Sequence, residues 1–224
     1  MATVVAVYTG QGLSKRIGPL FREELPGCRL VNIIDDSMIA DVIQAGGVTT
    51  AVVRRLVQYY RHAEDIGADL ILNTCSSVGE AADRVRSLFN IPIVKIDDDM
   101  ARQVTKNFNQ IGVLATLPTT LDPTRQLLQR EADLQNRNVS VVDALAVGAY
   151  QALISGQPEE HDRLIYEAAK SVAKKADVLV LAQGSMARME KALSDETGLP
   201  VYASPRLGIM AVRAELERQG KYPC

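Results

Sequence analysis

The sequence predicts an α/β protein made of two pseudo-symmetric lobes, each a doubly wound parallel sheet. Short apolar runs alternate with longer helical stretches along all 224 residues, which is the pattern of parallel strands joined by helices. The pattern also restarts near residue 110. Ala68-Asp69 and Ala176-Asp177 lie 108 positions apart, and so do Ile91-Pro92 and Leu199-Pro200. This constant spacing indicates an internal duplication.

The first half contains four expected strands, and most of its helix ends carry recognisable signals. Strands are expected at residues 3–8, 29–34, 70–72 and 91–96, with helices at 13–24, 49–66, 79–87 and 97–108 and a short one closed by Gly46-Gly47. Thr49 is suited to cap the N-terminus of the long helix, because its hydroxyl can accept a bond from a free backbone amide. Gly67 is expected to end that helix.

The second half repeats the order. Strands are expected at 110–115, 139–143, 178–181 and 201–203, and helices after Thr120, within 147–176 and at 205–219. Pro123 suits the first turn of its helix. We expect lobes at 1–98, joined by the C-terminal helix 206–224, and at 99–205. Ligands in such folds bind at the carboxyl ends of strands, so the active site is expected in the cleft between the lobes.

The composition narrows the class of protein. Hydrophobic residues make up 47% of the chain and the net charge is −2, which fits a globular protein with a core but lacks the basic surface that nucleic acid requires. No apolar run approaches the roughly 18 residues that would span a membrane. The chain enters a strand pattern at once, without a signal-peptide pattern. We therefore expect a cytoplasmic protein with no nucleic-acid or membrane partner.

Cysteine and histidine are scarce. The odd cysteine count, Cys28, Cys75 and Cys224, argues against a disulfide framework. No Cys-x-x-Cys occurs and there are only two histidines, so no metal site is expected. Both His62 and His161 are expected to be ordinary surface residues.

Cys75 is the strongest catalytic candidate. It follows an apolar run at the point where a strand gives way to a helix, so the helix dipole could lower the pKa of its thiol. Nearby amides and the hydroxyls of Thr74, Ser76 and Ser77 could hold an anion. A thiolate there could remove a proton next to a carboxylate. The alternative is a buried cysteine that only fills space; Cys28 and Cys224 are weaker candidates.

Other strand ends carry weaker candidates. Thr9-Gly-Gln-Gly12 lacks the third glycine of a dinucleotide fingerprint and the Lys-Ser/Thr of a P-loop. It is either a turn into a helix or a place where Thr9 and Gly10 line the cleft. Helix capping explains most of the acidic residues 35–36 and 97–99. The alternative is that at least one of them contacts a ligand, with Asp36 as the candidate. Thr116, Thr119 and Thr120 are either capping residues or donors to a ligand.

The chain resembles the aspartate/glutamate/hydantoin racemase superfamily. The resemblance rests on Asn73-Thr-Cys-Ser-Ser77, on Ile111-Gly-Val-Leu-Ala-Thr116, and on Leu181-Ala-Gln-Gly-Ser-Met186, which is similar to a Leu-Gly-Cys-Ala-Gly-Met motif of hydantoin racemases. It implies two pseudo-symmetric lobes, no cofactor, a small carboxylic-acid substrate and often a homo-oligomer. It also implies two cysteines that move a proton on and off a carbon beside a carboxylate or amide.

Carried onto this sequence, the resemblance makes Cys75 the first catalytic cysteine and places Gln183 where the second would be. An amide has no useful proton equilibrium near neutral pH, so Gln183 can only form hydrogen bonds. The resemblance implies that substrate carboxylate oxygens are bound by Asn73, Thr74, Ser76, Ser77, Thr116 and Ser185. From their places at strand ends, Thr9, Gly10, Asp36, Thr119, Thr120 and Gly184 are also expected to bind substrate.

Three functions follow. The first is a cofactor-independent isomerase or racemase in which Cys75 transfers a proton or adds to the substrate. The second is a lyase, a decarboxylase or retro-aldol enzyme, in which Cys75 protonates an enolate from one side only. The third is a ligand-binding homologue that lost activity with its second cysteine. The sequence does not name the substrate, which could be an amino, hydroxy, oxo or sugar acid.

Overall fold

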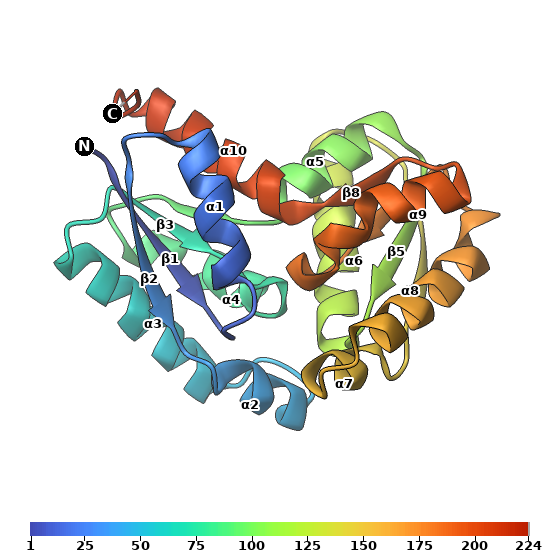
Figure 1. Cartoon of the computed structure of the whole chain (residues 1–224). Helices are drawn as coiled ribbons and strands as arrows, with labels where there is room; N and C mark the ends of the chain where they lie inside the picture. Colours follow the sequence, from blue (N-terminus) through green and yellow to red (C-terminus); the bar gives the residue numbers. More distant parts are fainter. Residues whose placement is uncertain (224) are drawn as a thin grey trace. The chain divides into compact units, whose positions relative to one another are not determined.

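The computed structural model describes residues 1–223 and divides the chain into two compact units. Unit 1 comprises Met1–Asp98 and the segment from Pro205 onward, and unit 2 comprises Asp99–Ser204. Each unit contains a four-stranded parallel sheet with helices packed against it (Figure 1). The predicted α/β class with two parallel-sheet lobes is confirmed.

The sheet of unit 1 has the strand order β2-β1-β3-β4. Its strands are β1 (Thr3–Tyr8), β2 (Arg29–Ile34), β3 (Leu70–Asn73) and β4 (Ile93–Lys95). Its helices are α1 (Ser14–Glu24), α2 (Met38–Ala45), α3 (Thr50–Asp65), the 3-10 turn η1 (Ser76–Val78), α4 (Gly79–Val85), the 3-10 turn η2 (Arg86–Leu88) and nearly all of α10 (Ser204–Arg218). All three pairings are parallel, so the carboxyl ends of the strands share one edge.

The sheet of unit 2 repeats that order as β6-β5-β7-β8. Its strands are β5 (Gln110–Ala115), β6 (Ser140–Leu145), β7 (Val178–Leu181) and β8 (Val201–Ala203). Its helices are α5 (Asp98–Asn107), α6 (Pro118–Leu134), α7 (Ala149–Ile154), α8 (Pro158–Ala173), the 3-10 segment η3 (Gly184–Met189) and α9 (Glu190–Thr197). The two sheets share one strand order, as a duplicated chain predicts.

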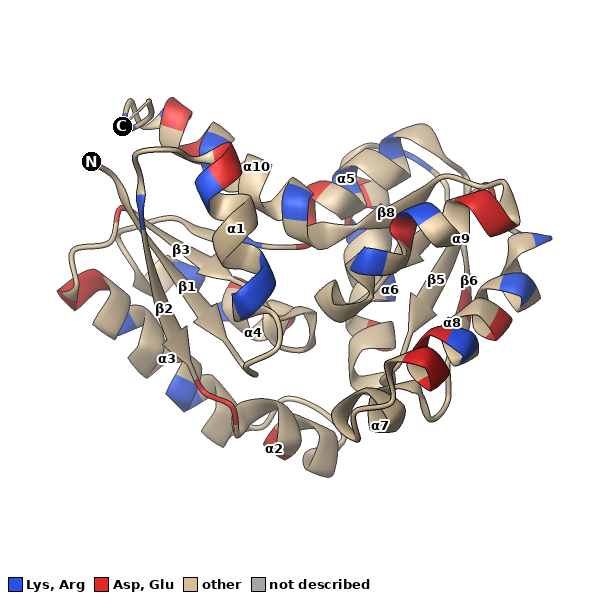
Figure 2. Ribbon diagram, in the orientation of Figure 1, with Lys and Arg blue, Asp and Glu red and all other residues tan. Residues whose placement is uncertain are grey.

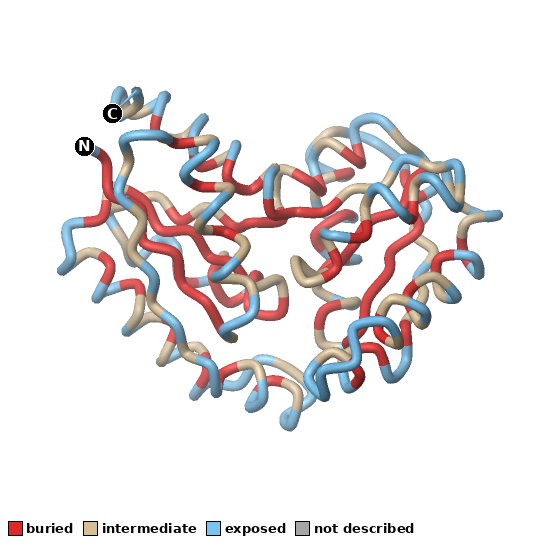
Figure 3. Tube along the Cα trace, in the orientation of Figure 1, coloured by how far each residue is buried: buried red, intermediate tan, exposed pale blue. Residues whose placement is uncertain are grey.

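The central strands of each unit are buried, because helices cover both faces of a parallel sheet (Figure 3). In unit 1, Leu56 and Tyr60 of α3 belong to the cluster of buried residues on one face, and Ile209 and Val212 of α10 belong to the cluster on the other. Gly208 allows α10 to come close: a Cβ there would lie 2.5 Å from the carbonyl oxygen of Ile96. Helix α10 therefore packs directly on the backbone that follows β4.

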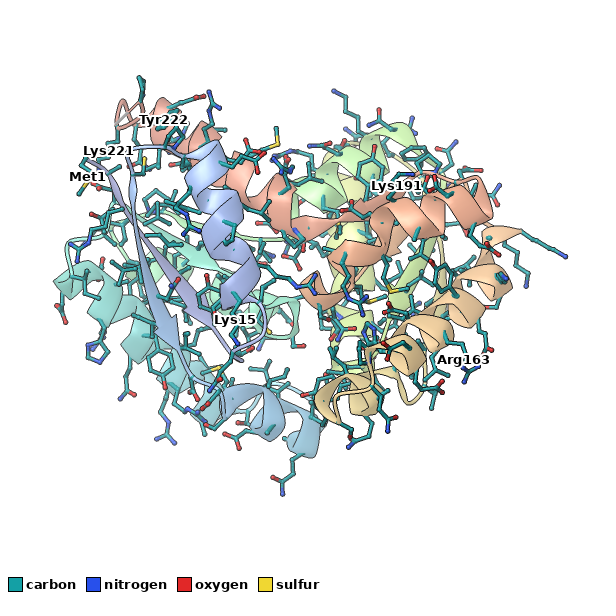
Figure 4. The ribbon with its side chains drawn as sticks, in the orientation of Figure 1. Met1, Lys15, Arg163, Lys191, Lys221 and Tyr222 are labelled. Carbon is teal, nitrogen blue, oxygen red and sulfur yellow. The ribbon has the colours of Figure 1, made fainter. Side chains whose placement is uncertain are left out.

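Charged side chains are spread over the helices of each unit rather than gathered in one basic patch (Figure 2). Many are paired along one helix, as Arg163 is with Glu160 and Glu167 on α8. At the C-terminal end of unit 1, Lys221 pairs with Asp69 at 2.7 Å, and Asp69 also accepts a bond from the Thr3 amide (Figure 4). Among the described residues, no helix is both long and apolar enough to cross a membrane.

Both predicted signals of the long helix are confirmed. The Thr49 hydroxyl accepts a bond from the Val52 amide, and Gly67 adopts a left-handed φ of 79° just after α3. The expected place of Pro123 was wrong, because α6 already begins at Pro118 and so has Pro123 inside it. The start of α6 was placed too late because the segment 116–120 was interpreted as a loop, whereas Pro118 occupies the first helical turn.

Two expectations for cysteine and histidine are corrected. His161 is fully buried, because it lies on the inner face of α8, where its Nδ1 contacts Asp162 at 2.8 Å. His62 is exposed as expected. Cys28 is disulfide-bonded, which the odd cysteine count does not exclude, since an odd count leaves only one thiol necessarily unpaired. Cys224 lies outside the described residues.

Candidate active site

Cys75 and Gln183 occupy equivalent positions in the two units. Each lies two residues beyond the end of a central strand, β3 or β7, and each immediately precedes a 3-10 segment. Their backbones are extended in the same way, with φ and ψ of −122° and 117° for Cys75 and −135° and 135° for Gln183. The strands also pair alike, with Val7 opposite Asn73 and Leu114 opposite Leu181. Thr9 and Thr116 are therefore equivalent neighbours of these two side chains.

Cys75 is a free, partly buried thiol surrounded by donors. The Thr9 hydroxyl and the backbone amides of Ser77 and Val78 donate to its sulfur, and these bonds lower the pKa of the thiol. Burial has the larger effect and raises that pKa above its ordinary value. The expected lowering by the helix terminus is thus outweighed by burial. The thiol is therefore protonated near neutral pH.

Asn73 and Thr74 hold the Cys75 turn in place. The Tyr60 hydroxyl donates to the Asn73 carboxamide at 3.1 Å, and the Asn73 amide group donates to the Cys75 carbonyl oxygen at 3.1 Å. The Thr74 hydroxyl donates to the Val7 carbonyl at 2.9 Å. Both side chains are buried and bonded within unit 1. Their observed contacts are with the protein itself, which fixes the direction of the Cys75 backbone.

Gln183 is held in one orientation by Thr116. The backbone amide of Thr116 donates to Oε1 of Gln183 at 2.6 Å, and the Thr116 hydroxyl contacts the same oxygen at 2.9 Å. A backbone N–H can only donate, so its partner must be the carboxamide oxygen rather than the nitrogen. The Nε2 group of Gln183 therefore points away from Thr116 and makes no hydrogen bond with any residue from 1 to 223. It is a pair of oriented donors.

The remaining predicted residues lie at or near the same strand edges. Ser76 and Ser77 begin η1, and Gly184 and Ser185 begin η3. Gly10 follows Thr9 and is half-buried, whereas Asp36 is exposed and accepts a bond from Gln11 at 2.5 Å. Thr119 and Thr120 lie in the first turn of α6, and the Thr119 hydroxyl is buried without a partner among the described residues.

The sequence did not predict the partners of three charged residues, although Asp35 and Asp97 belong to the acidic groups considered as possible ligand contacts. Asp97, which follows β4, is 4% exposed and lies close enough to Cys75 for its charge to raise the thiol pKa. Lys95 is buried between Asp83 and Asp98, at 2.8 and 2.9 Å. Asp35 is held by Arg55 and by the Tyr59 hydroxyl. Cys75 and Asp97 lie beside each other because each is two residues beyond the paired residues Asn73 and Lys95, a register that the predicted strand bounds did not give.

No group of three or more histidine, cysteine or acidic side chains suited to a metal ion occurs in the part of the chain that the structure describes. The carboxyl edge of unit 1 carries a thiol, hydroxyls and carboxylates, and that of unit 2 carries hydroxyls and an amide. The groups of unit 1 can transfer protons, and those of each unit can bind anions.

Comparison with known proteins identifies the class. The family model described as Asp/Glu/Hydantoin racemase matches residues 4–212. By family and fold, this is a racemase-like isomerase. The chain belongs to the Asp/Glu/hydantoin racemase family. No curated protein sequence matches it.

Solved structures of racemases share the fold. Glutamate racemase isoform RacE1 from Bacillus anthracis matches with a TM-score of 0.80 and 14% identity, covering 98% of this chain and 83% of that one. Aspartate racemase from Picrophilus torridus matches with a TM-score of 0.74 and 15% identity, covering 98% and 95%. Allantoin racemase from Klebsiella pneumoniae matches with a TM-score of 0.70 and 18% identity, covering 98% and 89%. At these identities the likeness is one of fold.

Proposed function

We propose that the protein is an isomerase that moves a proton at a carbon next to the carboxylate of a small acid, with Cys75 as the group that gives and takes the proton. The observation that carries this proposal is the environment of Cys75: a free thiol at a strand end, held by the Thr9 hydroxyl and two backbone amides. Those donors stabilise the thiolate that forms when the proton leaves. A cytoplasmic location and a homo-oligomeric state stay predictions.

We further propose that Gln183 binds the substrate through its Nε2 donors. Two bonds from Thr116 occupy its oxygen, which leaves the amide nitrogen as the group available to a ligand. An amide donor suits a carboxylate or carbonyl oxygen and cannot take part in proton transfer.

The same observations favour a lyase as the second candidate. A lyase needs one acid to protonate the enolate left when a carboxylate departs or a carbon–carbon bond breaks. The Cys75 thiol is protonated near neutral pH because burial raises its pKa, and Gln183 offers no second titratable proton. One thiol is sufficient for this reaction, whereas racemisation needs proton delivery to both faces of the carbon.

A proton-exchange screen separates these functions. The protein is incubated in heavy water with glutamate, aspartate, 2-hydroxy acids and allantoin, and loss of the α-proton signal is followed by NMR together with chiral analysis. Exchange with formation of both stereoisomers supports the isomerase. Release of carbon dioxide or an aldehyde supports the lyase. Binding without turnover, equal in wild type and Cys75→Ser, would overturn both and leave a binding protein.

Gln183→Glu is expected to weaken substrate binding more than turnover. Thr116 can still donate to one carboxylate oxygen, but the other replaces an amide donor with a negative charge facing an anionic substrate. Losing a hydrogen bond to a charged group costs about 1.5–3 kcal/mol, so KM is expected to rise by about 10-fold or more. Steady-state kinetics measure this, with exposed Gln126→Glu on α6 as the charge-matched control. An unchanged KM would remove Gln183 from the binding site.

A further inference from the structure

The carboxyl edge of unit 1 carries three chemically active side chains in a row. Val7, Asn73 and Lys95 are paired residues of β1, β3 and β4. The pairing continues past the strand ends, because the Thr74 amide donates to the Val7 carbonyl and the Ile96 amide to the Asn73 carbonyl. Two residues beyond the paired positions are Thr9, Cys75 and Asp97. A hydroxyl, a thiol and a carboxyl therefore occupy adjacent strand ends, and neighbouring strands lie about 4.8 Å apart.

Asp97 is buried without the partners that a buried carboxyl normally has. It is 4% exposed, and its Oδ1 is buried with no hydrogen-bond partner among the described residues. The nearest lysine in sequence, Lys95, is engaged by Asp83 and Asp98. Burying a carboxyl in this way is costly unless another group shares its charge or proton. The group beside it at this edge is the Cys75 thiol.

The second unit has no such row. Thr116 and Gln183 occupy the positions of Thr9 and Cys75, and the residue two positions after β8, where Asp97 follows β4, is Pro205. The titratable groups of the duplicated strand ends are thus confined to unit 1. A second group that can hold a proton beside the thiol gives Cys75 a partner within unit 1 with which to exchange its proton.

We propose that Asp97 is a positioning residue that acts through Cys75, exchanging a proton with its sulfur during catalysis. In the abstraction direction, the thiolate takes a proton from the substrate carbon as the C–H bond breaks and an S–H bond forms. The Asp97 carboxylate then takes that proton from sulfur, which forms an O–H bond and regenerates the thiolate. The reverse sequence delivers a proton to the carbanion. This inference rests on the proposed function of Cys75.

Other groups near the thiol do not offer the same route. From α3, Tyr60 interacts electrostatically with Cys75, but its hydroxyl donates to Asn73. From β1, Thr9 donates to the sulfur and has no useful acidity near neutral pH. Asp83 and Asp98 pair with Lys95 and Arg86, and the charge of Asp97 contributes to the raised pKa of Asp98. Within residues 1–223, Asp97 alone combines burial, an oxygen without a hydrogen-bond partner and an electrostatic interaction with the thiol.

Asp97→Asn is expected to make the thiol more reactive while making the enzyme slower. The amide is nearly isosteric but carries neither charge nor exchangeable acid proton. The midpoint of the pH profile for alkylation of Cys75 by iodoacetamide should fall by about one pH unit. At pH 8, the variant should therefore be alkylated about tenfold faster than the wild type. Proton exchange with substrate should fall about 100-fold. Asp99→Asn, which removes a carboxylate paired with Arg102, is the control and should change neither.

The outcomes distinguish this inference from the proposed function. If Cys75→Ser abolishes exchange but Asp97→Asn changes neither exchange nor the alkylation midpoint, the role of Asp97 is overturned. If Asp97→Asn lowers the midpoint but no acid undergoes exchange in the wild type, the coupling stands and the proposed function fails. Should Asp97→Asn not fold, the wild-type alkylation profile decides. If the two groups are coupled, a plot of the logarithm of the alkylation rate against pH should rise with a slope below one over part of its range. A plot that fits one ideal titration would contradict the coupling.

Discussion

Cys75→Ser is expected to reduce proton exchange by about 10²–10⁴-fold while leaving the free energy of unfolding within about 1 kcal/mol of the wild type. Serine has the same shape, and the Thr9 hydroxyl and the amides of Ser77 and Val78 can donate to its oxygen as they do to sulfur. A hydroxyl is far less acidic than a thiol, so it neither gives nor takes the proton efficiently. NMR exchange rates and urea unfolding measure the two effects.

The pH dependence of the wild type provides an internal check. Burial raises the pKa of the thiol, so the protonated form predominates at neutral pH and the thiolate forms only at pH values above the ordinary range for cysteine. Inactivation by iodoacetamide should therefore be slow at pH 7 and accelerate as the pH rises, and substrate should protect against it. Ser171→Ala, on an exposed position of α8, should behave like the wild type in both assays. More than a tenth of wild-type exchange in Cys75→Ser would rule out the thiol as the proton carrier.

Lys95→Met is expected to lower the free energy of unfolding by about 3 kcal/mol. The Lys95 side chain is 3% exposed and pairs with Asp83 and Asp98. Methionine fills much of the space beside Gly79 but leaves Asp83 and Asp98 with only the more exposed Arg86 as a cation. Breaking a buried ion pair by removing one partner is costly because the remaining charge stays buried. Guanidinium unfolding of both proteins measures the difference.

The loss of stability in Lys95→Met is expected to depend on pH. Burial already raises the pKa of Asp98, and losing Lys95 raises it further. A carboxyl with a raised pKa in the folded state is easier to bury when protonated, so the loss of stability should shrink as the pH falls. The control is Lys191→Met on α9, whose side chain is 87% exposed and pairs with Asp195 (Figure 4); it should change stability by less than about 0.5 kcal/mol. A Lys95→Met protein equal in stability to this control would contradict the buried-pair argument.

The sequence predicted the sheets well because its strands are buried. Apolar runs such as those of β1 and β7 are unambiguous when both faces of a strand are covered, and their polar endings marked the edge that carries Cys75 and Gln183. The repeat spacing also placed these two residues in equivalent positions, and the strand pairing shows this directly.

What the sequence could not supply were the tertiary partners of polar residues. Asp97 looked like a helix cap, because only the pairing of β3 with β4 places it beside a thiol. His161 looked like a surface residue, since the turn of α8 that buries it is determined by packing rather than by neighbours in sequence. The sequence also could not predict the direction in which the pKa of Cys75 shifts. Desolvation raises this pKa and depends on burial, and it opposes the lowering expected from the helix terminus.

The position of helix α10 at the end of the sequence affects the order in which the two units can fold during synthesis. Ile209, Val212 and Leu216 supply part of the buried apolar cluster of unit 1, yet they follow all of unit 2 in the sequence. On the ribosome, the sheet of unit 1 emerges first with one apolar face covered by α1 but not yet by α10, while unit 2 emerges as an uninterrupted segment that can fold as soon as it is released. The unit that begins first is therefore completed last, and the strand edge bearing Cys75 belongs to that late-forming unit.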